Sequence, residues 1–187
     1  MPLPVGLVHF LFGLGTGKTT SIVGLLIRGA GQGLRVALIQ FLKHTVNTTG
    51  NGFSCGEDNF LKAMKSPPNP VHIRQFGRAG FILPEEGPLP EDFQIANEGL
   101  NYARELVQSK KFDIVALDEI MDTVYFGLLP IAEIEALIKV KPKMVELILS
   151  GHHNYPEIQA LADYVTEFKP HKHPYERGIS ARKGIEF

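Results

Sequence analysis

Residues 7–20 read LVHFLFGLGTGKTT, in which a short apolar run leads into a glycine-rich turn that ends in Gly17-Lys18-Thr19. The apolar run is typical of a buried strand, and apolar side chains recur at helical spacing from Thr19 to Ala30. Glycines let the backbone of the turn approach an anion closely, and the N–H groups at the start of the helix point toward it. The segment therefore predicts a strand, a phosphate-binding loop and a helix, in that order.

The loop departs in one place from the strict phosphate-loop pattern, G-x-x-x-x-G-K-[ST]. Phe12 stands where the pattern requires its first glycine, and Gly13 follows one residue late. A glycine-rich turn that carries Gly-Lys-Thr by chance is therefore the alternative interpretation. The context favours a nucleotide site, because a later apolar strand that begins at Ile114 ends in Asp118 and Glu119. Carboxylates at a strand end are what a Mg²⁺–triphosphate site needs.

Strand and helix patterns alternate along the rest of the chain. We expect further strands at residues 36–41, 71–76, 114–117, 145–149 and 164–168, and helices at 91–109, 131–138 and 156–162, with one helical turn near 58–64. Because parallel strands need crossover connections, this alternation indicates a mostly parallel sheet with helices on both faces. We predict a three-layer α/β P-loop NTPase fold of the RecA-like type, formed as a single nucleotide-binding domain over residues 1–187.

Two segments are expected outside this sheet. Residues 77–90 carry three glycines and three prolines, which indicates an exposed loop or lid. Residues 169–187 form a basic tail, interpreted as a solvated edge, with substrate or dimer contact as the alternative. Between them, the helix that begins after Pro90 has acidic residues in its first turn, where negative charge suits the helix dipole. Its apolar face is expected to contain Phe93, Ala96, Leu100, Ala103 and Val107.

Composition and charge exclude several classes of protein. The chain has 19 Lys and Arg against 20 Asp and Glu, a balance of −1 with no polybasic field for nucleic acid or an anionic membrane. No apolar run reaches the roughly 18 residues that a membrane-spanning helix needs. Cys55 is the only cysteine, which excludes an intrachain disulfide framework and favours a cytoplasmic location. The acidic residues near Cys55 disfavour a nucleophilic role for its thiol.

The histidines include two groupings that invite a metal-site interpretation, His152-His153 and His171-Lys172-His173. Neither grouping has the i, i+4 helical spacing or the cysteine partner that is typical of a metal site. An imidazole near neutral pH also binds solvent or phosphate readily. We therefore interpret these side chains as solvated or phosphate-facing.

Beyond these motifs, the chain resembles the P-loop ATP:corrinoid adenosyltransferases, also called cob(I)alamin or cob(I)yrinic acid a,c-diamide adenosyltransferases. The phosphate loop of that family has the same late first glycine, and the resemblance spans nearly the whole chain. The other matching residues are Gly24, Arg28, Gly31, Gly33, Val36, Gln40-Phe41-Leu42-Lys43, Gly80-Phe81, Leu117-Asp118-Glu119, Ser150-Gly151, Lys172-His173-Pro174-Tyr175, Gly178-Ile179, Ala181 and Lys183-Gly184-Ile185-Glu186-Phe187. The string from the loop to Lys43 and the C-terminal string are specific to the family, whereas Gly-Lys-Thr and Asp-Glu are generic.

The resemblance implies an enzyme that transfers the 5′-deoxyadenosyl group of MgATP to the Co(I) of a reduced corrinoid such as cobalamin, with release of triphosphate. It implies that ATP is held in reverse relative to ordinary P-loop hydrolases, so that its ribose end faces the corrinoid. The implied partners are a reductase that supplies the electron and a second copy of the chain in a homodimer, with no nucleic acid and no membrane.

The resemblance also implies roles for individual residues. Lys18, Thr19 and Glu119 match catalytic positions, and Thr19, Glu119 and Asp118 match the positions that hold Mg²⁺. The implied nucleotide and corrinoid contacts are Gly13, Leu14, Gly15, Thr16, Gly17, Lys18, Thr19, Thr20, Arg28 and Phe81. Because a Co(I) nucleophile carries no proton, such chemistry needs alignment, leaving-group stabilisation and exclusion of water rather than a general base.

The chain departs from the family at three places. Leu14 and Thr16 stand where Asn and Lys are frequent, so one cationic contact to the triphosphate is missing. Leu83 stands where Trp is frequent, and His152 stands where Arg is frequent. Two other functions stay open at this point. One is a P-loop ATPase or kinase that releases ADP, and the other is a diverged protein that binds corrinoid or nucleotide without turnover.

Overall fold

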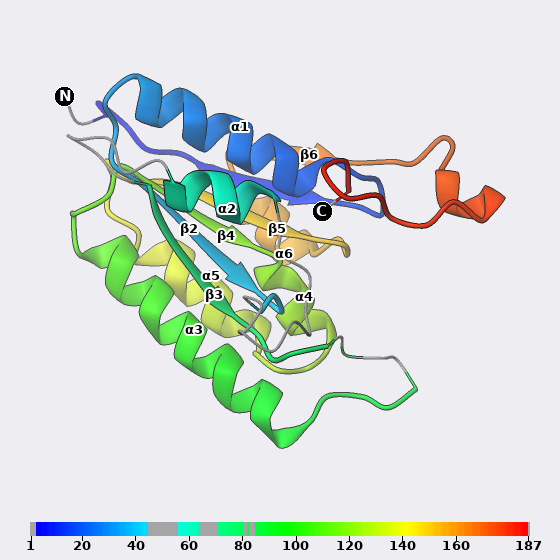
Figure 1. The fold of residues 1–187 in the computed structure, drawn as a ribbon. Coiled ribbons are helices and arrows are strands. Elements are labelled where there is room, and N and C mark those ends of the chain that lie inside the picture. Colours follow the sequence, from blue (N-terminus) through cyan, green and yellow to red (C-terminus); the bar gives the residue numbers. More distant parts are fainter. Residues whose placement is uncertain (1–2, 45–55, 64–70, 81, 83–84, 187) are drawn as a thin grey trace.

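The computed structural model describes residues 3–44, 56–63, 71–80, 82 and 85–186. Within these ranges the strands form a six-stranded sheet in the order β3-β2-β4-β5-β1-β6, and every neighbouring pair is parallel (Figure 1). The strands are β1 (Val8–Phe12), β2 (Val36–Phe41), β3 (His72–Phe76), β4 (Ile114–Asp118), β5 (Glu146–Gly151) and β6 (Tyr164–Glu167). The predicted strands and their parallel pairing are confirmed, with small differences at the strand ends.

Helices cover both faces of this sheet and complete three layers. Figure 1 shows α1 and α2 on one face, and α3, α5 and α6 on the other. The helices are α1 (Lys18–Gly31), α2 (Gly56–Ala63), α3 (Pro90–Gln108), α4 (Ile120–Tyr125), α5 (Ile131–Lys139) and α6 (Pro156–Leu161), with a short 3₁₀ helix, η1 (Pro174–Arg177). The arrangement confirms the predicted α/β, P-loop NTPase-like fold. None of the helices in the described ranges is long and apolar enough to cross a membrane.

A hydrophobic core lies on each face of the sheet. On one face, Ile39 and Leu117 pack into a cluster with apolar residues of α3, α4, α5 and α6. On the other face, Leu38 packs into a cluster with Ile22 and Leu26 of α1. Since β2 is covered on both faces, all of its residues are buried. This double coverage is why its sequence is a nearly continuous apolar run rather than an alternation.

The buried face of α3 differs from the prediction at its first turn. Phe93 is 41% exposed, and Asp92 takes the inward position one residue earlier. The Asp92 carboxylate accepts hydrogen bonds from Nε of Arg78 at 2.9 Å and from the N–H of Leu89 at 2.8 Å. These bonds compensate a carboxylate that would otherwise be costly to bury. The prediction that Phe93 lies on the buried face is therefore wrong. The spacing of apolar residues gives no information about the ion pair that allows Asp92 to be buried instead.

The sequence patterns did not predict α4, which begins directly after Glu119. Its first residues, Ile120 and Met121, are buried. The helix packs closely on the end of β5, where a Cβ atom at Gly151 would lie only 2.5 Å from Cβ of Met121. A helix of six residues is shorter than two turns, so its periodicity is too brief to recognise.

Residues 169–186 follow β6 and are almost entirely exposed. Figure 1 shows this tail extending away from the sheet and then returning toward the end that carries the start of α1. Its one regular element is η1, which is closed by Gly178 at a φ of 73°. Whether this tail is a solvated edge or contacts a substrate or a second copy of the chain stays a prediction.

Candidate functional site

The predicted phosphate loop lies at the carboxyl edge of the sheet, between β1 and α1. Gly13 and Gly17 have φ angles of 114° and 107°, in the left-handed region that favours glycine. The N–H of Gly15 donates a hydrogen bond of 2.8 Å to the carbonyl of Phe168, which follows β6. A Cβ atom at Gly15 would lie 2.8 Å from that same carbonyl oxygen. The loop therefore needs its glycines both for conformation and for close packing against the end of β6.

Lys18, the first residue of α1, folds back over this loop. Its ammonium donates hydrogen bonds to the carbonyls of Gly13 at 2.6 Å and Gly15 at 3.0 Å, and the residue is only 8% exposed. Burial lowers the pKa of the Lys18 ammonium, and the nearby carboxylate of Asp122 opposes that shift. A desolvated positive charge thus lies within the loop.

The structure brings only part of the expected nucleotide contacts together. The loop glycines, Lys18 and Thr19 lie at one place, and Leu14, Thr16 and Thr20 are exposed around it. Arg28 lies in the last turn of α1, at the opposite end of that helix from Lys18. A contact between Arg28 and a nucleotide in this loop therefore stays a prediction.

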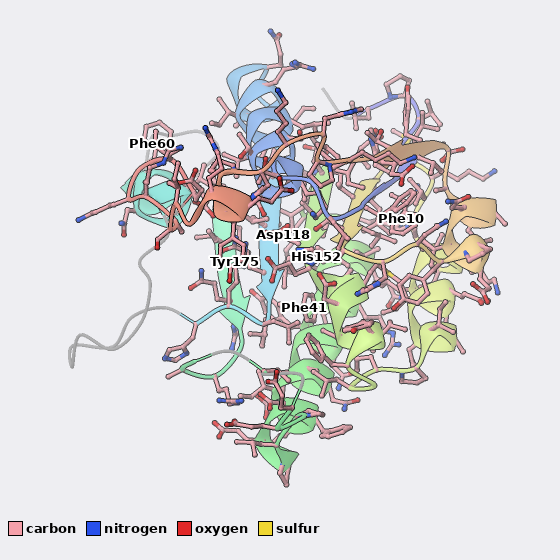
Figure 2. All side chains as sticks on the ribbon, turned by 90° about the vertical axis from the view of Figure 1, so that its right-hand side faces the viewer. Phe10, Phe41, Phe60, Asp118, His152 and Tyr175 are labelled. Atoms are coloured by element: carbon pink, nitrogen blue, oxygen red, sulfur yellow. The ribbon has the colours of Figure 1, made fainter. Side chains whose placement is uncertain are left out.

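Asp118, the last residue of β4, is the centre of a buried hydrogen-bond network (Figure 2). Its carboxylate accepts hydrogen bonds from Thr19 Oγ1 at 3.0 Å, Ser150 Oγ at 2.8 Å, Gln40 Nε2 at 3.3 Å and Lys43 Nζ at 2.8 Å. Burial alone would raise the pKa of the Asp118 carboxyl, but the charge of Lys43 and these hydrogen bonds hold that pKa below its usual value. The site therefore keeps a buried carboxylate in its ionised form.

Glu119 follows in an unusual backbone conformation. Its φ angle is 61°, and its N–H donates a hydrogen bond of 2.9 Å to Ser150 Oγ. The left-handed conformation costs a residue with a side chain about 1–2 kcal/mol, and such residues cluster at functional sites. Burial raises the pKa of the Glu119 carboxyl to about 7, and Lys43 opposes that shift.

Lys43 links these acidic residues to the loop. Its ammonium lies 2.8 Å from Asp118 Oδ2, and 3.4 Å from both Glu119 Oε1 and Thr19 Oγ1. Lys43 belongs to the family-specific string, and no role was predicted for it from the sequence. The sequence does not show which strands are neighbours in the sheet. Because β2 and β4 are neighbouring parallel strands, side chains that follow their carboxyl ends meet at one edge of the sheet.

His152 and Asp122 form a second polar pair at this edge. The N–H of His152 donates a hydrogen bond of 2.9 Å to Asp122 Oδ1, and His152 Nδ1 lies 3.0 Å from Asp122 Oδ2. The hydrogen bond to Asp122 raises the pKa of the His152 imidazole, and burial opposes the shift. Asp122 was not predicted from the sequence, because it lies on α4, a helix of only six residues.

Comparisons with known proteins identify the family of this chain. A family model described as ATP:corrinoid adenosyltransferase BtuR/CobO/CobP matches residues 4–187. The chain belongs to this family. The corrinoid adenosyltransferase of Escherichia coli (strain K12) is 29% identical over 182 residues, which cover 97% of this chain and 86% of that protein. The corrinoid adenosyltransferase of Pseudomonas aeruginosa is 31% identical over 181 residues, which cover 97% of this chain and 82% of that protein.

Not every adenosyltransferase motif can be placed in the structure. Phe81, the predicted corrinoid contact, lies outside the described residues, as do Leu83 and Cys55. The neighbouring Gly80 is described, and its φ of 92° lies in the left-handed region that favours glycine. The role of Phe81 in this member of the adenosyltransferase family therefore stays a prediction.

The other histidines of the two groupings have local contacts or are exposed. The ring of His153 stacks on the ring of Tyr125, with centroids 3.8 Å apart. Nδ1 of His173 accepts a hydrogen bond of 3.2 Å from the N–H of Tyr175 in the tail. His171 is exposed. Among the described residues, no three His, Cys, Asp or Glu side chains form a cluster that could hold a metal on their own.

The oxygen atoms around Lys43 nevertheless suit a hard divalent cation. Thr19 contributes a hydroxyl, and Asp118 and Glu119 contribute carboxylates, all within 3.4 Å of one ammonium. Mg²⁺ prefers oxygen ligands and takes few of them from the protein, since nucleotide phosphates and water complete its shell. The donor set therefore fits a Mg²⁺ ion that arrives with ATP.

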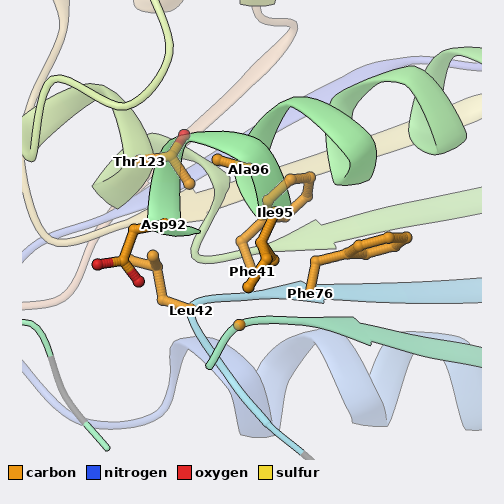
Figure 3. A pocket seen from close by; sticks show the side chains of 8 residues that line it. Phe41, Leu42, Phe76, Asp92, Ile95, Ala96 and Thr123 are labelled. Atoms are coloured by element: carbon orange, nitrogen blue, oxygen red, sulfur yellow. The ribbon is translucent and has the colours of Figure 1, made fainter. Parts of the chain in front are cut away.

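A narrow apolar pocket lies beside this network, between the ends of β2 and β3 and the start of α3 (Figure 3). Figure 3 shows the rings of Phe41 and Phe76 at one side of it and the carboxylate of Asp92 at the other. Its free space is about that of one water molecule. The pocket is a gap in side-chain packing and is too small to hold ATP or a corrinoid.

Proposed function

We propose that this protein transfers the 5′-deoxyadenosyl group of ATP to the cobalt of a reduced corrinoid and releases triphosphate. The Co(I) electron pair forms a bond to C5′ of ATP, and the C5′–O bond breaks with its electrons going to the triphosphate. The observation that carries the proposal is the buried Lys18 ammonium inside the loop, next to the Thr19–Asp118 hydrogen bond, in a member of the adenosyltransferase family. The names of the relatives support a corrinoid as the acceptor.

Lys18 and the loop would stabilise the leaving triphosphate. Negative charge grows on the triphosphate as the C5′–O bond breaks, and donors that are already in place stabilise that charge most effectively. Two carbonyl oxygens of the loop hold the Lys18 ammonium, which has three N–H donors and would donate to phosphate oxygens from this position. Co(I) carries no proton, so no side chain has to act as a general base.

Thr19, Asp118 and Glu119 would hold Mg²⁺. When bound, Mg²⁺ supplies positive charge that stabilises the departing triphosphate. Ser150 and Gln40 orient the Asp118 carboxylate through hydrogen bonds of 2.8 and 3.3 Å. Partners of this kind fix the direction of a metal-binding oxygen and tune its affinity.

The same proposal covers the organisation of the chain. Residues 1–187 would act as a single domain, with residues 77–90 as a lid whose Phe81 contacts the corrinoid. Arg28 would contact the nucleotide. A reductase would supply the electron that generates Co(I), and the active form would be a homodimer. These assignments are supported by the family resemblance and by the glycine and proline content of the 77–90 segment.

The proposal is tested by incubating the protein with ATP, Mg²⁺ and chemically reduced cobalamin without oxygen. We expect a light-sensitive adenosylated corrinoid and an equal amount of triphosphate. Release of ADP would instead identify an ATPase or kinase. Binding of cobalamin and ATP with no adenosylated product would identify a diverged binding protein.

A further inference from the structure

The Lys43 ammonium lies among the same three side chains that we assign to the metal. Its distances to Asp118 Oδ2, Glu119 Oε1 and Thr19 Oγ1 are 2.8, 3.4 and 3.4 Å. The Lys43 side chain is 18% exposed, and the Asp118 side chain is completely buried. We propose that this ammonium stands in for the divalent cation in the metal-free protein, and that the cation displaces it on binding. The inference rests on the proposed function, because it takes these three residues as the metal-holding set.

The positive charge of Lys43 explains how the acidic residues of the site are stable in the metal-free protein. Two acidic side chains follow each other at the end of β4, and a buried carboxylate without a compensating charge is strongly destabilising. The Lys43 ammonium compensates Asp118 directly. The Lys18 ammonium, by contrast, is directed to the carbonyls of Gly13 and Gly15. Lys43 is therefore the residue whose charge the incoming cation replaces.

The displacement would involve the side chain and leave the backbone in place. Leu42 has a φ of 57°, so the chain turns sharply just before Lys43. Gly77 packs against this turn so closely that a Cβ atom there would lie 2.6 Å from the backbone nitrogen of Lys43. A lysine side chain is a flexible stem with a strongly hydrated head, so its ammonium can leave a fixed backbone position. The released ammonium stays at the edge of the sheet that carries the loop, where triphosphate would attract it.

This competition has a consequence for the order of binding. A free divalent cation must break the Lys43–Asp118 hydrogen bond, which weakens its binding in the absence of nucleotide. Triphosphate oxygens add ligands for the cation and attract the displaced ammonium at the same time. The site therefore selects the metal–nucleotide complex over the metal alone.

Binding of Mn²⁺ to the nucleotide-free protein tests the displacement, with free Mn²⁺ followed by electron paramagnetic resonance. Lys43→Met removes the charge and keeps an apolar stem of similar length. We expect this variant to bind Mn²⁺ about tenfold more tightly than the wild type, or better, because no charge-assisted hydrogen bond has to be broken. Affinity that is equal to or weaker than that of the wild type would overturn the proposal.

Lys141→Met is the matched control. The Lys141 ammonium is also partly buried, and it donates hydrogen bonds of 2.7 and 2.8 Å to the carbonyls of Gly6 and Val145. These carbonyls precede β1 and β5, at the opposite edge of the sheet from Asp118. This control should leave the affinity for Mn²⁺ unchanged. A tightening in Lys141→Met equal to that in Lys43→Met would contradict a specific role for Lys43.

Thermal unfolding provides a second readout if Lys43→Met is unstable without metal. A ligand that binds only the folded state raises the unfolding midpoint, and at a fixed concentration a ligand that binds more tightly raises it further. Mn²⁺ should therefore raise the midpoint of Lys43→Met more than that of the wild type at the same concentration, and an equal or smaller rise overturns the proposal.

The variant Asp118→Asn distinguishes failure of the proposed metal site from failure of the proposed displacement. Mn²⁺ binding that survives Asp118→Asn unchanged rejects the metal site itself, whereas its loss with no gain in Lys43→Met rejects only the displacement.

Discussion

The hydroxyl of Thr19 lies 3.0 Å from the carboxylate of Asp118, although 99 positions separate the two residues in the chain. In the sheet, β5 lies between β1 and β4, so the contact spans the end of β5. Ser150, near the end of β5, donates a hydrogen bond to the same carboxylate at 2.8 Å. The phosphate loop and the acidic strand end are thereby joined into one site.

This contact makes the hydroxyl of Thr19 a test of the metal site. Thr19→Ala should lower kcat/KM for ATP by about 10- to 100-fold, since a hydrogen bond to a charged group is worth about 1.5–3 kcal/mol. Thr19→Ser keeps the hydroxyl and should stay near the wild-type value. Both rates are measured as formation of the adenosylated corrinoid at saturating acceptor. Equal losses in the two variants would show that the methyl group matters and the hydroxyl does not.

Lys18 is predicted to act on the leaving triphosphate. Lys18→Ala should reduce turnover by on the order of 10²–10³-fold, the usual effect of removing one preorganised donor to developing negative charge. Lys139→Ala is the control, because the exposed Lys139 side chain pairs with Glu135 on α5 at 2.9 Å, away from the phosphate loop. Turnover of the control should be unchanged. Near-native turnover in Lys18→Ala would remove the assigned role.

The packing of Gly15 against Phe168 predicts a stability difference between two glycines of the same region. Gly15→Ala should lower the free energy of unfolding by about 1–3 kcal/mol, because the new Cβ would meet a backbone carbonyl at 2.8 Å. Gly24→Ala, on the exposed side of α1, meets no atom within 4 Å and should raise the free energy of unfolding by about 0.5–1 kcal/mol. Urea denaturation measures both. A tolerated Gly15→Ala would show that the loop moves freely relative to β6.

The His152–Asp122 pair predicts a pH-dependent contribution to stability. Folding raises the pKa of His152 above its ordinary value of 6.5. The stabilisation is therefore fully present below about pH 6.5, and it is lost as the pH rises through the raised folded pKa. At about pH 5.5, His152→Gln should be less stable than the wild type by roughly 0.5 kcal/mol, a small value because the imidazole is 46% exposed and solvent screens the pair.

The measurement for this pair is the difference in unfolding free energy between the wild type and His152→Gln across pH. That difference should shrink as the pH rises through the raised folded pKa, when the imidazole is neutral in both the folded and the unfolded chain. Asp122→Asn should remove the pH dependence as well. A difference that grows with pH would contradict the assigned direction of the pKa shift.

Much of the fold was predictable because the central strands β2 and β4 are buried on both faces. β2 is apolar except for Gln40, and β4 is apolar up to Asp118 at its end. Because α1 also repeats its buried residues at helical spacing, both kinds of element can be recognised in the sequence. The exceptions have local causes. α4 is too short for its period to be recognised, and the inward position at the start of α3 is taken by Asp92, whose ion pair with Arg78 joins two separate segments.

The candidate site was predictable only where its functional residues are adjacent in the sequence. The run of loop residues through Thr19 and the pair Asp118-Glu119 are local strings, and the structure brings them together. Lys43 was quoted without a role and Asp122 was missed. Lys43 reaches the site because β2 and β4 are neighbouring strands, and Asp122 lies on α4, which is too short to show a helical period.

The alternation of strands with the longer helices, the glycine-rich loop and the family were determined by the sequence alone, because hydrophobic period and short motifs are properties of residues close together in the chain. Only the tertiary structure decided that a lysine after β2 neutralises an aspartate at the end of β4, and that a histidine after β5 pairs with an aspartate of α4. The physical reason is that electrostatic partners are selected by distance in space, and that distance is set by the order in which the strands are hydrogen-bonded.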